Sequence, residues 1–169
     1  MHADVDTPGS ALNLIVVEDS ELDYELLLAT LMREGLRPRA VRVEDEAGMR
    51  AAFAAGPIDA VITDHNLPRF DSLASIKVAK SVDSDIPVIV LSGEMSEELA
   101  VATLHAGADD FVLKTRMFRI VAALQNSLRA AAARRESRAP TSALAESEAR
   151  LRALTQHLER AKAEERRAI

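Results

Sequence analysis

The chain has 169 residues, of which 48% are apolar but only 3% aromatic, so it can bury a core and that core must be aliphatic. It contains no cysteine, which excludes disulfides and thiolate metal sites. The net charge of −6 is uneven: residues 134–169 hold nine Lys/Arg and six Asp/Glu, which leaves −9 on residues 1–133 and argues against nucleic-acid binding there.

Short apolar runs rich in Val and Ile alternate with helical periodicity from Leu12 onward. Residues 1–11 show no periodicity and predict a flexible N-terminal arm. Strands are expected at residues 12–17, 39–43, 58–63, 86–91 and 111–113. Helices are expected to begin near Leu22, Glu46, Asp71, Met95 and Met117, and three of them to end at Gly35, Gly56-Pro57 and Gly107.

Five strands that alternate with five helices predict an α/β fold with a parallel sheet and helices on both faces. The flavodoxin-like, doubly wound strand order 2-1-3-4-5 fits this pattern. In that order a crevice lies outside the carboxyl ends of the first and third strands. No apolar run approaches the ~20 residues of a membrane helix, and the acidic, polar N-terminus does not resemble a signal peptide, so we expect a cytoplasmic protein without membrane partners.

The C-terminal part has a different pattern. Arg138 to Ser142, with Pro140 among them, predict a break, so residues 12–135 are expected to form a domain and residues 136–142 a linker. Residues 143–169 then predict a coiled-coil helix and a homodimer, although a monomeric solvated helix is the alternative. Ser147 and Glu165 interrupt the seam, whose other members are Leu144, Leu151, Leu154, Leu158 and Ala161.

Polar residues follow four of the predicted strands, at the edge where parallel strands place ligand sites. Asp64 is a candidate acceptor for a phosphoryl group, and the acids Glu18 and Asp19 are candidate Mg²⁺ ligands. Lys114 is suited to pair with a phosphoryl oxygen, and Ser92 to donate a hydroxyl hydrogen bond. Simpler readings are open for each: a helix cap for Glu18-Asp19, a turn acid for Asp64 and a surface charge for Lys114.

Four segments resemble the response regulator receiver domain of two-component signalling over about residues 12–135: residues 16–20, 63–68, 91–93 and 106–114. The resemblance implies that Asp64 is the phosphorylated aspartate, taking its phosphoryl group from a phosphohistidine-bearing kinase or phosphotransfer protein. It implies a Mg²⁺ site made by Glu18, Asp19, Asp64 and the backbone carbonyl of Asn66. It also implies a switch hydroxyl, a phosphate-binding lysine and a switch aromatic, which are Ser92, Lys114 and Phe111.

Three positions depart from the family pattern. Thr115 replaces the usual proline after the lysine, so a cis bond is not expected there. Arg69-Phe70 and Ser72 replace glycines, which suggests a stiffer loop after Asp64. Phe111 lacks the hydroxyl of the commoner tyrosine, and it is either plain core or a mobile switch.

The tail from Leu154 to Ile169 resembles the helix that leads into the histidine box of one histidine kinase class. We therefore expect a receiver that signals through this helix to a kinase or output region absent from the chain, with at most self-phosphorylation and autodephosphorylation activity of its own. A degenerate receiver that serves only for dimerisation or docking is the alternative. A Mg²⁺-dependent phosphatase is disfavoured, because Asn66 stands where such enzymes need a second acid.

Overall fold

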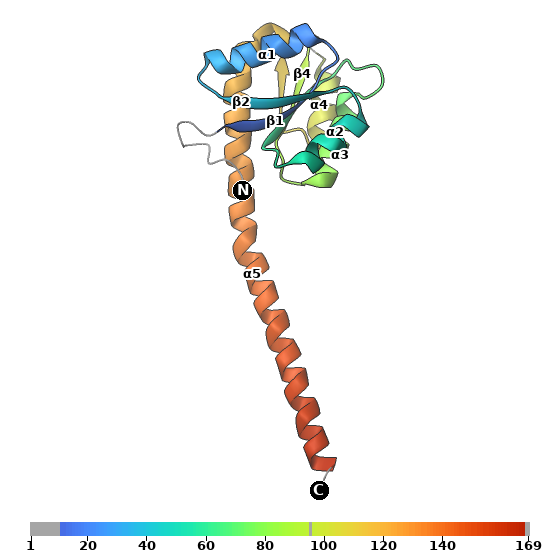
Figure 1. The fold of residues 1–169 in the computed structure, drawn as a ribbon, viewed down its shortest axis with the longest axis vertical. Helices are drawn as coiled ribbons and strands as arrows, with labels where there is room; N and C mark the ends of the chain where they lie inside the picture. Colours follow the sequence, from blue (N-terminus) through green and yellow to red (C-terminus); the bar gives the residue numbers. More distant parts are fainter. Residues whose placement is uncertain (1–10, 95, 168–169) are drawn as a thin grey trace. The chain divides into compact units, whose positions relative to one another are not determined.

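The computed structural model describes residues 11–94 and 96–167. One parallel sheet has the order β2-β1-β3-β4-β5, which confirms the predicted fold (Figure 1). Its strands are β1 (Leu12–Val17), β2 (Pro38–Val43), β3 (Ala60–Asp64), β4 (Val88–Ser92) and β5 (Asp110–Leu113). The helices are α1 (Glu21–Arg33), α2 (Glu46–Ala55), α3 (Ser72–Val82), α4 (Glu97–His105) and α5 (Ile120–Arg167), with a 3-10 helix η1 (Lys114–Arg119) before α5.

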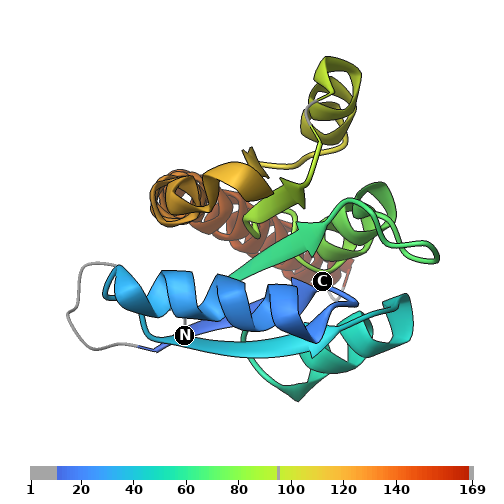
Figure 2. The same cartoon turned by 90° about the horizontal axis from the view of Figure 1, so that it is seen from above.

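Helices cover both faces of the sheet (Figure 2), and the core beneath them consists of two apolar layers, one on each face. Side chains alternate along each strand, so Ile15 and Val17 of β1 face one layer while Leu14 and Val16 face the other. The first layer is completed by residues of α2 and α3, such as Met49. The second is completed by α1 and the first turns of α5. Because both faces are covered, the strands read as continuous apolar runs in the sequence.

Local polar groups begin and end the helices. The side chains of Ser20, Asp45, Asp71 and Ser96 cap α1, α2, α3 and α4 by accepting a backbone N–H from the first turn. Gly35 and Gly107 follow α1 and α4 with φ of 87° and 111°, a conformation in which a side chain would be strained. These caps fix where each helix leaves the sheet edge.

The observed strands are shifted slightly from the predicted ones. Strand β4 begins after Pro87 instead of at Ile86, because proline has no N–H to donate to the ladder. Strands β3 and β4 each extend one residue further than predicted, so Asp64 and Ser92 are themselves the last strand residues. The predicted helix start at Met95 and most of the predicted N-terminal arm lie outside the described residues.

The predicted break at residues 136–142 is wrong at the level of secondary structure, because α5 continues through them. A proline inside a helix removes one hydrogen bond, and the alanines and charged residues on either side are strong helix formers. Contacts divide the chain into two units between Ala131 and Ala132. Within the described ranges, no helix is both long enough and apolar enough to span a membrane.

Replacing a central core side chain should cost far more stability than replacing one on the sheet edge. Ile62 of β3 is fully buried, so we expect Ile62→Ala to lower the free energy of unfolding by about 2–5 kcal/mol. Val41 of the edge strand β2 is 49% exposed, and Val41→Ala should cost less than about 1 kcal/mol. Urea unfolding of both variants measures the difference, and equal costs would contradict the assigned core.

Candidate functional site

The polar residues at the strand ends meet at the carboxyl edge of the sheet. In the parallel register Val17 of β1 pairs with Thr63 of β3, so the residues that follow them, Glu18 and Asp64, are neighbours. Both side chains are only 5% exposed. Lys114 comes directly after β5, at the same edge. The predicted convergence of Glu18, Asp64 and Lys114 is therefore present in the structure.

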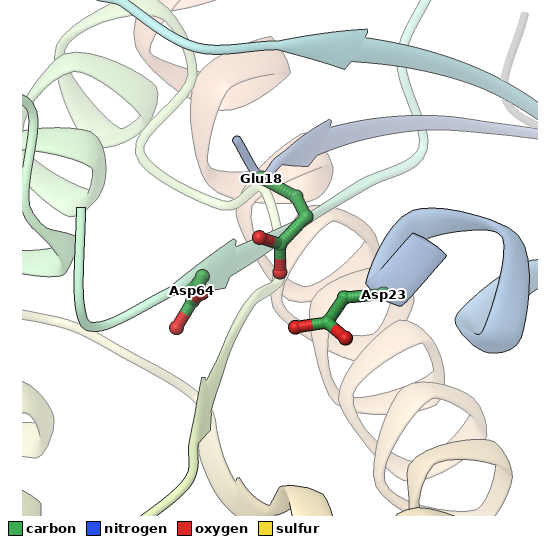
Figure 3. Close-up of side chains that lie close together, drawn as sticks. All are labelled: Glu18, Asp23 and Asp64. Atoms are coloured by element: carbon green, nitrogen blue, oxygen red, sulfur yellow. The ribbon is translucent and has the colours of Figure 1, made fainter. Parts of the chain in front are cut away.

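The Lys114 ammonium is the centre of this site. Its Nζ donates to Asp23 Oδ2 at 2.9 Å, to Asp64 Oδ2 at 3.0 Å and to Glu18 Oε2 at 3.3 Å. The three carboxyl groups approach one another from the end of β1, the first turn of α1 and the end of β3 (Figure 3). One oxygen of each lies within 4.8 Å of the others. A single cation thus neutralises part of a concentrated negative charge.

The turn after β1 holds Glu18 in place. The Ser20 N–H donates to Glu18 Oε1 at 3.0 Å, and Arg42 Nη1 donates to the carbonyl oxygens of Glu18 at 3.3 Å and Asp19 at 3.4 Å. The Asp19 side chain itself is exposed. Arg42 therefore ties the acidic turn to the edge strand β2 through the backbone of the turn and not through the Glu18 or Asp19 carboxylate.

Asp23 is the site residue that the sequence interpretation missed. It lies in the first turn of α1, where its N–H donates to the capping Ser20 hydroxyl at 3.2 Å. Among the described residues, the group of mutually close carboxylates contains Asp23 together with Glu18 and Asp64, and not Asp19. The available signal was an acid three residues after the helix-capping serine, because that spacing puts it on the turn nearest the strand ends.

The loop after Asp64 is held by hydrogen bonds and by burial, and two of the residues involved, Phe70 and Ser72, stand where glycines were expected. The Asn66 N–H donates to Asp64 Oδ1 at 3.1 Å, which orients the carboxylate. Ser72 is fully buried and shares a hydrogen bond of 2.8 Å with His65 Nδ1. Phe70 is buried in the core layer below. These contacts tie both ends of the loop, and the stiffer loop itself stays a prediction.

The predicted switch residues have partners away from the carboxylates. Ser92 is fully buried, and its hydroxyl donates to the Glu94 carbonyl at 3.0 Å and accepts the Glu94 N–H at 3.2 Å. Phe111 is partly buried: it packs against the core and also lines a hollow with Ala100 of α4 and Arg116 of η1. The described residues contain no cis peptide bond, so Lys114-Thr115 is trans.

Burial and crowding change the protonation of this site. Burial raises the pKa of Glu18 from 4.5 to about 7, the Asp64 charge and the Asp19 side chain add to the rise, and the Ser20 N–H and Lys114 oppose it. Burial lowers the pKa of the Lys114 ammonium, but hydrogen bonds to Asp23 and Asp64 and the charges of Asp64 and Glu18 outweigh this and raise it overall. The lysine therefore stays charged, whereas Glu18 titrates near neutrality.

The donor set fits a hard divalent cation. Mg²⁺ prefers carboxylate and carbonyl oxygens and keeps several waters, and the convergent oxygens here come from three carboxylates. Thiolate is absent from the chain, and the imidazole of His65 is already paired with Ser72. The residues present are therefore of the type that holds Mg²⁺.

The raised pKa of Glu18 predicts a pH-dependent stability. The folded state binds more protons than the unfolded state between pH 4.5 and about 7, so the contribution of Glu18 to stability falls as the pH rises through this window. Glu18→Gln removes the buried charge and should stabilise the protein by about 1–3 kcal/mol at about pH 8 and by clearly less at about pH 5.

Thermal unfolding at the two pH values tests this. Glu25→Gln, on an exposed position of α1, is the matched control and should change stability by less than about 0.5 kcal/mol at either pH. A gain from Glu18→Gln that is independent of pH would show that Glu18 is fully ionised in the folded protein over this range.

Curated proteins of similar sequence include transcriptional regulators. Transcriptional regulatory protein PrrA of Mycobacterium tuberculosis is 35% identical over 114 residues, which are 65% of this chain and 46% of PrrA. Transcriptional regulatory protein QseB of Haemophilus influenzae is 30% identical over 117 residues, 69% of this chain and 52% of QseB. The chain thus spans about half the length of these curated relatives. Because both are named transcriptional regulators, the predicted absence of nucleic-acid binding stays a prediction.

Solved structures have the same architecture. NtrX from Brucella abortus superposes with a TM-score of 0.66 at 27% identity, over 76% of this chain and 29% of NtrX. The receiver domain of a Pseudomonas aeruginosa sensor histidine kinase, solved with a magnesium ion in its active site cleft, gives a TM-score of 0.60 at 20% identity, over 70% and 98% of the two chains. The sequence model of the response regulator receiver domain matches residues 14–125, which include all but the first two residues of the sheet and all four residues of the Lys114 ion-pair cluster. Together with the fold, that match shows that this chain belongs to the response regulator receiver domain family.

Proposed function

We propose that this protein accepts a phosphoryl group on Asp64 from a phosphohistidine of a partner kinase or phosphotransfer protein. The observation that carries the proposal is the setting of Asp64: a carboxylate at the end of β3, held by the Asn66 N–H and paired with Lys114 beside a second buried acid. A carboxylate in this setting can act as a nucleophile. The Lys114 ammonium lies close enough to stabilise the negative charge of the phosphoryl group that the carboxylate accepts.

The transfer needs no further protein group to form or break a bond. An oxygen of the Asp64 carboxylate bonds to phosphorus while the phosphorus–nitrogen bond of the phosphohistidine breaks. The bonding electron pair stays on the imidazole nitrogen, and the product is an acyl phosphate on Asp64. Lys114, a charged donor already within 3.0 Å of Asp64, supplies a hydrogen bond to a phosphoryl oxygen.

The proposed metal residues are Glu18, Asp19, Asp64 and the carbonyl of Asn66, and the Glu18 and Asp64 carboxylates already lie close together. When bound, Mg²⁺ supplies positive charge to the phosphoryl oxygens. Arg42 and Ser20 hold the acidic turn in one geometry, and the buried setting of Glu18 and Asp64 limits the water that competes for them.

Ser92 and Phe111 are the proposed switch. Ser92 ends the strand beside Asp64, and its hydroxyl is bonded within its own loop, so a phosphoryl group on Asp64 offers it a different, charged partner. Movement of that loop changes the hollow that Phe111 lines together with α4. The surface around α4 and β5 would then carry the signal.

Asp64→Asn should abolish phosphorylation and leave the fold intact, because the amide is nearly isosteric but is not a nucleophile. The test is incubation with acetyl phosphate and Mg²⁺ followed by intact mass measurement. Asp45→Asn is the matched control, since Asn caps a helix as well as Asp does, and it should be phosphorylated like the wild type.

Each outcome has a distinct meaning. A phosphoryl group gained by Asp64→Asn would refute the assignment of Asp64. A wild-type protein that gains none would favour the alternative, a receiver that acts only as a dimerisation or docking module.

We further propose that the C-terminal helix pairs in parallel with a second copy and relays the signal to a kinase or output region. The support lies in the second unit of the chain: Leu144, Leu151, Leu154 and Leu158 are 61%, 62%, 57% and 53% exposed, although they share one heptad seam. Exposed leucines in such a row gain burial by pairing with an identical row. Ser147 and several alanines in the seam make the pairing modest.

Leu151→Lys with Leu158→Lys should give monomers, because lysine at a seam position puts charge into the apolar interface. The control carries two lysines off the seam, Ala153→Lys with Gln156→Lys, and should stay dimeric. Sedimentation velocity at tens of micromolar decides, with acetyl phosphate reactivity as the check that Asp64 is unaffected. A wild-type chain that is monomeric under these conditions would refute the dimer.

A further inference from the structure

Lys114 has three carboxylate partners, but the proposed function gives roles to only two of them, Glu18 and Asp64. The third, Asp23, makes the shortest contact, 2.9 Å from its Oδ2 to Lys114 Nζ. In Figure 3 its carboxylate points from α1 toward the other two acids. The exposed fraction of the side chain separates the three: 43% for Asp23 against 5% for Glu18 and 5% for Asp64.

A gain in the stability of the fold does not explain the ion pair between Asp23 and Lys114 well. A pair with a partly exposed acid contributes little to stability, because water and salt screen it. Geometry is a better reason. Asp23 is placed by the N-terminal cap of α1, where its own N–H binds Ser20 Oγ, so its carboxylate belongs to a fixed helical turn instead of a loop.

The Lys114 side chain, in contrast, does not by itself hold its ammonium in one place. Its ammonium ends a flexible four-carbon stem with three rotatable donors. Lys114 lines a small cavity together with Glu18, Asp23, Tyr24 and apolar side chains including Leu91 and Met117, so an untethered ammonium has room to leave Asp64. Productive contact with a group on Asp64 depends on holding the ammonium there, and small misplacements of such a group are costly.

We propose that Asp23 is a positioning residue that anchors the Lys114 ammonium from α1, so that one of its N–H donors turns from the Asp64 carboxylate to a phosphoryl oxygen without the lysine leaving the site. The inference rests on the proposed phosphorylation of Asp64. It assigns Asp23 a role that acts through Lys114 and not through the metal.

The experiment is a double-mutant cycle on the full chain, with Asp23→Asn, Lys114→Ala and the two combined. The rate of phosphorylation by acetyl phosphate is measured at saturating Mg²⁺. We expect Asp23→Asn to slow it by roughly three- to tenfold, and to have no further effect in the Lys114→Ala background. Asp23→Glu keeps the charge and should restore part of the rate.

Glu21→Gln is the matched control. Glu21 is the other acid in the first turn of α1 and is exposed, so its removal changes the charge at the helix N-terminus without touching Lys114. Its phosphorylation rate should equal that of the wild type. A loss in Glu21→Gln as large as that in Asp23→Asn would overturn the proposal in favour of a general effect of charge.

Two readouts do not depend on phosphorylation. Mg²⁺ titration should give the same affinity for Asp23→Asn and wild type to within about twofold, whereas Asp19→Asn should weaken binding. The NMR signal of the Lys114 ammonium should be observable in the wild type and broaden in Asp23→Asn through faster exchange with water. A large loss of Mg²⁺ affinity in Asp23→Asn would make Asp23 a metal ligand and overturn its assignment as an anchor.

The failure of this inference is distinct from that of the proposed function. A wild-type protein that gains no phosphoryl group overturns both. A wild-type protein that is phosphorylated, with an Asp23→Asn variant that reacts equally fast or whose defect persists without Lys114, overturns the anchor alone.

Discussion

The structure depends on the neutralisation of clustered carboxylates by one ammonium. A parallel sheet brings the ends of β1, β3 and β5 to one edge, and with them Glu18, Asp64 and Lys114. Two of these acids are 5% exposed, which is unfavourable for ionised groups unless they are paired and hydrogen-bonded. Lys114 provides the pairing, and backbone N–H groups of Ser20 and Asn66 provide the hydrogen bonds.

The neutralisation is incomplete, and that incompleteness suits a site that binds charge. One ammonium faces three carboxylates, and the pKa of Glu18 rises to about 7 by burial and by repulsion from Asp64. Added positive charge, from a proton or a divalent cation, relieves the repulsion. The receiver fold thus keeps a local instability at its functional edge while the two apolar layers on either side of the sheet supply the stability of the whole.

The loop after Asp64 shows how a family pattern is changed without losing the site. Where glycines are usual, this chain has Phe70, which is buried in the core, and Ser72, which is buried and bonded to His65. The larger side chains are accommodated because the apolar ring of Phe70 packs in the apolar core and the hydroxyl of Ser72 hydrogen-bonds to His65.

Local patterns in the sequence determined the fold and most of the site. The strand and helix periods predicted a parallel α/β sheet that the order 2-1-3-4-5 fits. The polar residue after each apolar run predicted Glu18, Asp64 and Lys114, because the carboxyl ends of parallel strands meet at one edge of the sheet. Only the tertiary structure decided which further acid joins them. Asp19 is adjacent to Glu18 in sequence but is exposed and is not among the three mutually close carboxylates, whereas Asp23, in the first turn of α1, lies close to Glu18 and Asp64. The sequence pattern also did not predict that α5 continues across Pro140. The free-energy cost of one proline inside a helix is set against the helix propensities of all the residues around it, and the local pattern does not show which of the two is larger.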